Sequence, residues 1–284
     1  MVNESPDTPP RRTLRPTRRG RLALFIGIGI VLVLVVAAAV LVPLLTRGPQ
    51  VERARSLLIP EGRRASQVYE AVDKSLDVEP GTTGKAATTA DLPLPAEAKG
   101  NPEGYLFPAT YPITSDTTPQ SLLRYMVDTA VQRFGADHIS AGAQRNGVSV
   151  YQTVTIASIV QAEADTTADM GKVARVVHNR LERGMPLQMD STLNYALNRS
   201  TLHTTTSDTK IDSPYNSYEH KGLPPTPIGN PGEQAMTAAI NPTPGAWLYF
   251  VTVAPGDTRF TSSYTEQQRN VAEFNRNRRS ASGG

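Results

Sequence analysis

A single carboxylate stands out in this sequence because it lies on an otherwise apolar helical stripe. In the segment TIASIVQAEAD, residues Ile156, Ile159, Val160 and Glu163 recur at the i, i+3, i+4 and i+7 spacing of one helix face. An acid held against aliphatic neighbours has its ionised form disfavoured, so its pKa rises. A carboxylic acid that is still protonated near neutral pH can serve as a general acid. Glu163 is therefore the first candidate catalytic residue, and the alternative is a glutamate at the edge of the core that reaches out to water.

Other catalytic chemistries have less support. The chain has no cysteine, which excludes thiol catalysis and cysteine-ligated metal. Its four histidines, at positions 138, 178, 203 and 220, show no metal-binding spacing, so neither a metal nor another cofactor is expected. The SDTK segment at 207–210 matches the S-x-x-K of penicillin-recognising enzymes, but no K-T-G or S-D-N accompanies it. The remaining carboxylates in unusual surroundings are Glu103, Asp190, Asp212 and Glu219.

The elements that must position these residues follow a segment that is long and apolar enough to cross a membrane. Residues 22–45, from Leu22 to Leu45, contain no charged side chain and would extend about 36 Å as a helix. A cleaved signal peptide would have a shorter apolar core, of roughly 7 to 15 residues. Six arginines precede the segment and only Arg47 follows closely, so the positive-inside rule places the N-terminus in the cytoplasm. The sequence predicts a single-pass cell-membrane protein whose folded part is extracytoplasmic.

The positive charge of the chain is confined to its N-terminal tail. The formal net charge is +3, but residues 1–21 carry six arginines against Glu4 and Asp7, which leaves about −1 for the remainder. A nucleic-acid-binding surface needs basic residues clustered on a folded face, so no nucleic-acid partner is expected. The two ends of the chain, 1–21 and 277–284, are polar and are expected to be disordered.

The order of helix-like and strand-like segments in the globular part predicts an α+β fold, because helices and strands are segregated rather than alternating. Residues 51–76 suggest a short strand, a turn and a helix capped by Ser66, and residues 77–102 suggest a linker. A hairpin is expected around the APGD turn, and Asp190 or Ser191 is expected to cap a short helix. Further helices are expected at 118–135, 149–165, 169–185, 190–198 and 265–276, and a long functional loop at 211–233.

Seven separated segments resemble, in order and spacing, motifs of the MltG/YceG-like endolytic murein transglycosylases. These segments are EGYLFPATY, ASIVQAEA, VVHNRLERGMPLQMDSTLNYAL, DSPYNSY, GLPPTPIGNPG, AAINPTP and LYFV, and the resemblance covers residues 51–275. In many members of that family, the motif of the catalytic helix looks like A-S-[IL]-V-E-K-E. Here Gln161 replaces the first glutamate and Glu163 aligns with the second. The resemblance therefore implies that Glu163 carries the chemistry.

The resemblance also implies an organisation for the whole chain. A cytoplasmic tail (1–21) and a transmembrane helix (22–45) precede a small LysM-like subdomain with a linker (46–100). A catalytic domain (101–276) and a tail (277–284) follow. The implied activity is lytic transglycosylation of nascent peptidoglycan strands, which would limit their length, with peptidoglycan synthases as expected partners.

In the implied mechanism, Glu163 protonates the oxygen between N-acetylmuramic acid and N-acetylglucosamine. Its carboxylate then takes the proton of the muramoyl 6-hydroxyl as that oxygen attacks C1. The product is a 1,6-anhydro end, and neither water nor a cofactor is needed.

Candidate substrate-binding residues lie in two polar segments. Aromatic faces and amides in YNSY suit acetamido sugars, and side chains in QMDST could orient Glu163 or the glycan. For each of them the alternative is a role in packing a loop. These candidates are Gln188, Asp190, Thr192, Tyr215, Asn216 and Tyr218.

Two alternative functions remain open from the sequence. Gln161 would suit a non-catalytic peptidoglycan-binding scaffold of the cell-wall synthesis machinery, although the retained Glu163 argues against it. A glycoside hydrolase generally needs a second carboxylate, about 5 to 10 Å from the first, and Asp190 is the candidate for it.

Overall fold

The computed structural model describes residues 35–37, 39, 41, 55–201 and 204–282. The chain divides into two compact units, Met1–Arg53 and Ala54–Gly284. The predicted tail 1–21 and most of the predicted membrane segment 22–45 lie outside the described residues. Within the ranges that are described, every helix is too short or too polar to cross a membrane.

The first part of the second unit is built on a two-stranded antiparallel sheet with its own apolar core. Strand β1 pairs with β2, and Leu57 lies opposite Tyr111. Both of these side chains are buried with apolar residues of α2, α3 and α4. The strand, turn and helix predicted for 51–76 are confirmed. The elements of this part are β1 (Arg55–Leu58), α2 (Ala65–Leu76), α3 (Thr82–Thr89), η1 (Ala96–Ala98), β2 (Thr110–Ile113) and α4 (Pro119–Phe134).

Two local predictions in this part are wrong. Helix α2 begins at Ala65 after an extended Arg64, so Ser66 is not its N-cap. The stretch expected as a linker contains α3 because a buried carboxylate holds the start of that helix. Asp73 accepts hydrogen bonds from the backbone N–H groups of Gly81 (2.7 Å) and Thr83 (2.8 Å). Burial opposes ionisation of Asp73, but the hydrogen bonds from Thr83 and Gly81 outweigh it and lower the pKa of the carboxyl.

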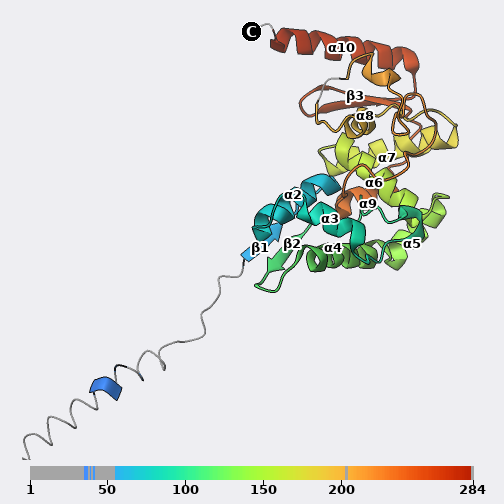
Figure 1. The fold of residues 1–284 in the computed structure, drawn as a ribbon. Helices are drawn as coiled ribbons and strands as arrows, with labels where there is room; N and C mark the ends of the chain where they lie inside the picture. The colour runs from blue at the N-terminus through green and yellow to red at the C-terminus, as the bar shows by residue number, and fades with distance from the viewer. Residues whose placement is uncertain (1–34, 38, 40, 42–54, 202–203, 283–284) are drawn as a thin grey trace, which may run out of the picture. The chain divides into compact units, whose positions relative to one another are not determined.

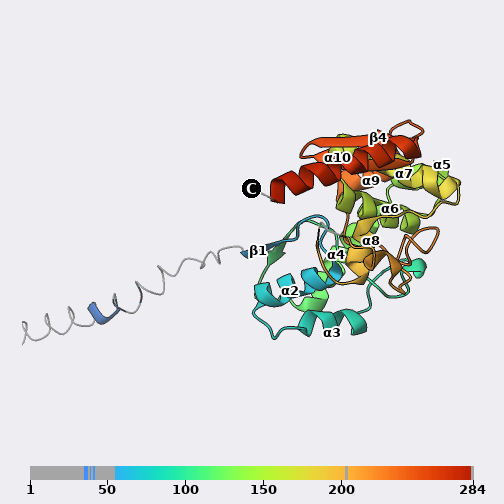
Figure 2. The ribbon, with the colours of Figure 1, turned by 90° about the horizontal axis from the view of Figure 1, so that it is seen from above.

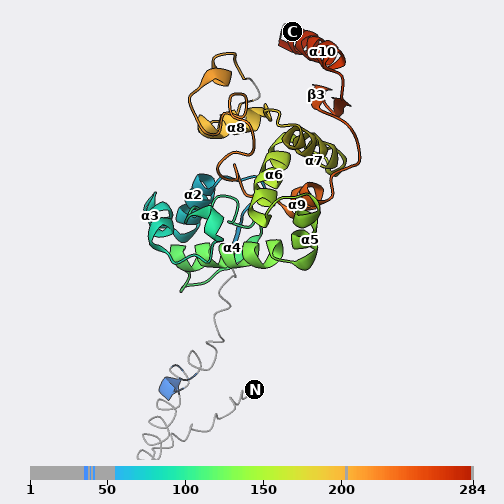
Figure 3. The ribbon, with the colours of Figure 1, turned by 90° about the vertical axis from the view of Figure 1, so that its right-hand side faces the viewer.

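The remainder of the unit is mostly helical, with a second small sheet. The predicted α+β class is confirmed in part. The described residues form a mostly helical domain with two small two-stranded sheets. Helices α6 and α7 lie between the β3–α10 end and the α2–α4 end (Figure 3). The elements are α5 (Asp137–Arg145), α6 (Val150–Glu163), α7 (Thr167–Glu182), α8 (Asp190–Ala196), η2 (Asp208–Lys210), α9 (Glu233–Ile240), β3 (Tyr249–Ala254), β4 (Asp257–Thr261) and α10 (Tyr264–Ser282).

Helix α6 is buried on nearly all sides, which goes beyond the single apolar stripe that the sequence predicts. It packs against α5, α7, α8 and α9. Ile156, Ile159 and Val160 are fully buried, as expected from their spacing. The polar residues on the other faces are buried too, and Thr155 satisfies its hydroxyl by donating to the Tyr151 carbonyl (3.1 Å). The two ends of α6 emerge from the core, with Gln152 exposed near the start and Ala162 exposed beside Glu163 at the end.

The predicted hairpin is confirmed, and helix α10 lies along it (Figure 1, Figure 2). Side-chain amides fix this contact. Gln267 donates to the Phe250 carbonyl (3.0 Å) and Asn277 donates to the Val253 carbonyl (2.9 Å). Helix α10 runs to Ser282, through most of the segment 277–284 that the sequence predicts as a tail.

Candidate active site

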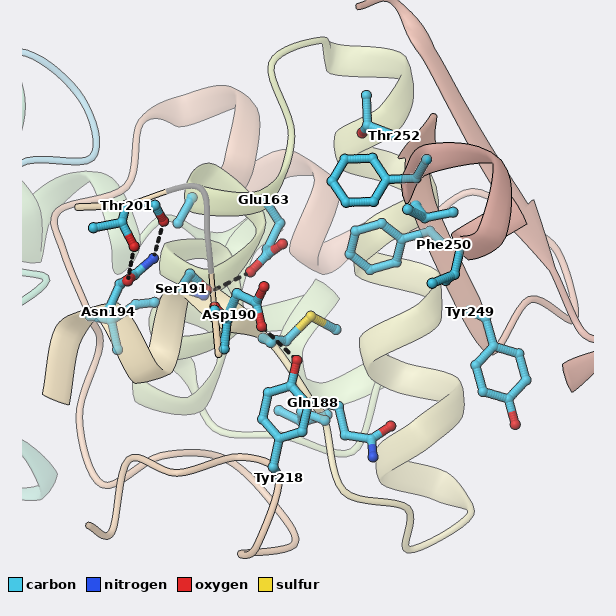
Figure 4. A pocket seen from close by; sticks show the side chains of 18 of the residues that line it. Glu163, Gln188, Asp190, Ser191, Asn194, Thr201, Tyr218, Tyr249, Phe250 and Thr252 are labelled. Carbon is cyan, nitrogen blue, oxygen red and sulfur yellow. Dashed lines mark hydrogen bonds between the residues drawn. The ribbon is translucent and has the colours of Figure 1, made fainter. Parts of the chain in front are cut away.

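Glu163 ends helix α6 at the wall of a cavity of about 900 Å³. One wall consists of the end of α6, residues 187–191 and the start of α8. The other wall consists of strand β3 and helix α10. Figure 4 shows Glu163, Asp190 and Ser191 on one side of this space and the ring of Phe250 on the other.

The surroundings of Glu163 favour its protonated form. Burial raises the pKa of Glu163, hydrogen bonding from Ser191, through its backbone N–H, lowers it in part, and the nearby Asp190 charge raises it further. The backbone N–H of Ser191 donates to Oε1 at 3.1 Å (Figure 4). This contact leaves Oε2 as the oxygen best placed to carry an acidic proton. A helix C-terminus also disfavours negative charge, which acts in the same direction.

Asp190 and Tyr218 form a hydrogen-bonded pair in the same cavity. The Tyr218 hydroxyl donates to Asp190 Oδ1 at 2.5 Å. Burial and this hydrogen bond raise the pKa of Tyr218, so the hydroxyl keeps its proton. Asp190 is the first residue of α8, whose N-cap position is Met189, so the capping role expected for Asp190 or Ser191 is wrong.

Gln188 also lines the cavity, in a left-handed backbone conformation with φ of 53°. Its Oε1 accepts a hydrogen bond from Arg180 Nη1 at 3.1 Å. Of the six predicted substrate-binding residues, the structure therefore places Gln188, Asp190 and Tyr218 at the cavity with Glu163.

The other three predicted contact residues do not line the cavity. Thr192 is fully buried and donates to the Met189 carbonyl (2.8 Å). Asn216 is fully buried, and its amide donates to two carbonyls of its own loop. Tyr215 shares a hydrogen bond with the Thr226 hydroxyl (2.9 Å). For these residues the geometry fits the alternative of loop packing, because their polar groups are already engaged.

Arg180 has a central position that the sequence analysis did not assign. It is buried on helix α7 and lines the cavity. Its Nε donates to the Leu248 carbonyl (2.6 Å), and its Nη1 donates to the carbonyls of Pro186 (3.0 Å) and Leu187 (2.8 Å). One guanidinium therefore ties the segment that leads to Asp190 and Ser191 to the segment that enters β3. The spacing of Val173, Val176, Val177 and Arg180 is i, i+3, i+4 and i+7, the same signal that identified Glu163.

Gln161 stands where the catalytic-helix motif described above has a glutamate. Its side chain makes a hydrogen bond within the fold. Its Oε1 accepts a hydrogen bond from the backbone N–H of Gly232 at 3.0 Å, which joins α6 to the start of α9. An amide has no acidic proton at accessible pH, so this position cannot replace Glu163 as a general acid.

Glu103 lies apart from the cavity and joins two parts of the unit. Its Oε1 accepts from the Ala65 N–H at the start of α2 (2.9 Å), and its Oε2 accepts from the Tyr195 hydroxyl on α8 (3.0 Å). Burial raises the pKa of Glu103 to about 7, against the lowering effect of these hydrogen bonds and of the Arg64 charge. Glu103 thus has a structural role, as a buried carboxyl that is largely protonated below neutral pH.

This raised pKa predicts a pH-dependent stability. The unfolded chain releases the Glu103 proton near pH 4.5, whereas the folded chain holds it to about pH 7. The free energy of unfolding should therefore fall as the pH rises through this window, by an amount on the order of 3 kcal/mol from this group. Glu103→Gln should flatten the curve in that window when unfolding by urea is measured at several pH values. Parallel curves for the two proteins would contradict the prediction.

In the part of the chain that the structure describes, histidine and carboxylate side chains form no cluster of three or more that could hold a metal ion.

Comparison with known proteins gives a consistent family match. The model of the YceG-like family matches residues 36–273. The endolytic murein transglycosylase of Bacillus subtilis (strain 168) is 37% identical over 171 residues, which cover 59% of this chain and 46% of that protein. The endolytic murein transglycosylase of Streptococcus pneumoniae (strain D39) is 34% identical over 255 residues, which cover 80% of this chain and 46% of that protein. The chain thus spans about half the length of the curated relatives it matches.

A solved structure shares the fold. The crystal structure of a YceG-like protein from Listeria monocytogenes matches with a TM-score of 0.66 at 29% sequence identity. The match covers 76% of this chain and 75% of that one.

Proposed function

Because the chain belongs to the YceG-like family, we propose that it is an endolytic lytic transglycosylase of peptidoglycan with Glu163 as its catalytic acid and base. The observation that carries this proposal is the position of Glu163. Glu163 is the last residue of a buried helix. Its carboxyl has a raised pKa, and the residue lines a cavity of about 900 Å³. A general acid for glycosidic cleavage requires this combination of a retained proton and access to substrate.

In the proposed reaction one carboxyl acts twice. The proton on Glu163 Oε2 passes to the glycosidic oxygen between N-acetylmuramic acid and N-acetylglucosamine. The bond from this oxygen to the muramoyl C1 breaks, and N-acetylglucosamine leaves with a 4-hydroxyl. The Glu163 carboxylate then accepts the proton of the muramoyl 6-hydroxyl as O6 bonds to C1. Glu163 is protonated again at the end, and the product carries a 1,6-anhydro ring.

The other cavity residues support this reaction electrostatically. Positive charge develops at C1 as the glycosidic bond breaks. The Asp190 carboxylate, held by the Tyr218 hydroxyl, lies in the same cavity and would stabilise this charge. Gln188 offers an amide to the acetamido groups of the glycan.

We also propose the cellular setting that the sequence predicts. Residues 22–45 would anchor the protein in the cell membrane with its N-terminus in the cytoplasm and its catalytic part outside. The antiparallel pair of β1 and β2, which shares an apolar core with α2, α3 and α4, supports a LysM-like subdomain. In this setting the enzyme would cut nascent strands close to peptidoglycan synthases and so limit strand length.

Product chemistry tests the proposal directly. Purified full-length protein in detergent is incubated with uncross-linked glycan strands, and the products are analysed by mass spectrometry. We expect 1,6-anhydromuramoyl ends. Strands that are bound but never cut would overturn the proposal in favour of a peptidoglycan-binding scaffold.

A hydrolase is the second candidate because Asp190 supplies another carboxylate to the cavity. In that case the new ends would be reducing ends, one water heavier than the anhydro ends. Asp190→Asn would then abolish cleavage, since the base that activates water would be lost.

A further inference from the structure

The cavity wall opposite Glu163 contains residues that the proposed mechanism does not use. Strand β3 contributes Tyr249, Phe250 and Thr252 to this wall (Figure 4), and helix α10 forms the rest of it. The lining side chains of α10 recur every three to four residues, so one face of the helix follows the cavity. These residues are Tyr264, Gln267, Val271, Phe274, Asn275 and Arg278.

Part of this face is apolar and exposed, which the packing of the fold does not require. Tyr264 is 62% exposed and Val271 is 37% exposed. The other exposed large apolar side chains in the described part of the second unit, Leu58, Tyr125 and Val131, lie outside this cavity. An exposed aromatic ring in the wall of a cavity that also contains polar groups is typical of a ligand-binding surface.

The aromatic rings of this wall are in contact with other side chains of the protein. The rings of Tyr249 and Tyr264 lie 5.7 Å apart, and the Arg180 guanidinium carbon lies 5.2 Å from the centre of the Tyr249 ring. Phe250 stacks on Phe260 at 5.7 Å. A ring that is ordered before binding loses little conformational entropy when a ligand stacks on it.

The same wall contains an acceptor without a partner. Gln267 donates through Nε2 to the Phe250 carbonyl, but its buried Oε1 has no hydrogen-bond partner. Thr204, which also lines the cavity, likewise has a buried hydroxyl without a partner. Buried polar groups are nearly always paired. Of the four buried side-chain atoms without a partner among the described residues, three belong to residues that line this cavity, Ser191, Thr204 and Gln267.

We propose that Tyr264 and Gln267 form a subsite for an acetamido-sugar ring of the glycan strand, on the wall opposite the catalytic acid. Tyr264 offers the ring on which the apolar face of a pyranose stacks. Gln267 lines the same wall, and a rotation of its side chain would turn its amide toward a hydroxyl or acetamido group of the same sugar. This subsite rests on the proposed function for the identity of its ligand, and it binds the strand without taking part in bond cleavage.

Binding measured without cleavage tests the subsite. In full-length protein carrying Glu163→Gln, the Kd for peptide-free glycan oligosaccharides is measured by calorimetry. Tyr264→Ala should raise Kd about twofold to tenfold, the range expected for one lost aromatic stack. Tyr264→Phe keeps the ring and should bind nearly as before. Tyr125 on α4 is another exposed tyrosine, at 51% against 62% for Tyr264, so Tyr125→Ala is the control and should not change Kd.

Two outcomes would overturn the subsite. One is an unchanged Kd for Tyr264→Ala, and the other is an equal loss for the Ala and Phe substitutions, which would assign the effect to the hydroxyl. In the cleaving protein, Tyr264→Ala should raise KM and leave kcat unchanged. If no variant cleaves but Tyr264→Ala still weakens binding, the proposed function fails and the subsite stands. If cleavage occurs and Tyr264→Ala changes neither Kd nor KM, only the subsite fails.

Discussion

Glu163→Gln is expected to lower kcat for glycan cleavage by about 10³-fold, within the range that a positioned general acid contributes. Glutamine keeps the shape of the side chain and can still accept the Ser191 N–H, but it has no acidic proton. The Kd for glycan should therefore change little. The measurement is the rate of appearance of 1,6-anhydro ends by mass spectrometry, together with Kd by calorimetry.

Two further variants make this expectation specific. Glu163→Asp retains an acid but withdraws it by about one methylene, and a misplacement of this size can cost about 10²-fold. Gln161→Glu is the matched control on the same helix, since its carboxylate can still accept the Gly232 N–H and should leave kcat near that of the native protein. Activity that survives Glu163→Gln would remove Glu163 from the mechanism and direct attention to Asp190.

The pH profile should reflect the raised pKa of Glu163. The protonated form is the active form of a general acid, so kcat should fall as the pH rises through the pKa of the folded enzyme. Because burial raises that pKa, the descending limb should lie above the ordinary glutamate range. A descending limb near pH 4.5 would contradict the environment described for Glu163.

The sequence predicts the residues that lie on regular helices better than those on loops. Glu163 is found because helical spacing places it beside Ile156 and Ile159, and the structure confirms that both of these are buried. The same rule marks Arg180, beside Val176 and Val177, as a charged group directed into the core. Periodicity detects both residues because a helix fixes the direction of each side chain.

Loop residues lack such a rule. Thr192 and Asn216 have the chemistry of sugar contacts, but their directions depend on hydrogen bonds to Met189 and to the carbonyls of Thr209 and Ile211. These contacts form only when the whole loop is folded, and no local pattern encodes them. Helix α3 was missed for a related reason, because the Asp73 side chain, which lies on a different helix, holds its first turn.

Arg180→Met is expected to lower the free energy of unfolding by about 3 kcal/mol. Methionine fills the space of the aliphatic stem but leaves the carbonyls of Pro186, Leu187 and Leu248 without their donor. Each buried acceptor that loses its partner costs about 1 to 3 kcal/mol, and partial access to cavity water reduces the sum. Urea unfolding monitored by circular dichroism measures the change. An unfolding midpoint equal to that of the native protein would contradict it.

The matched control is Arg175→Met, on the same helix. Arg175 also donates to two backbone carbonyls, those of Pro242 and Thr243, but it does not line the cavity. Its loss should reduce stability without changing the catalytic pH profile.

Arg180→Met should change that profile as well, because Arg180 holds the segment that presents Ser191 to Glu163. The hydrogen bond from the Ser191 N–H lowers the pKa of Glu163, so loosening it should raise that pKa and move the descending limb of kcat to higher pH. Arg180→Lys, which keeps the charge but lacks the planar fork of donors, should lie between the native protein and Arg180→Met in both measurements. A pH profile that is unchanged in a destabilised Arg180→Met protein would limit Arg180 to the stability of the fold.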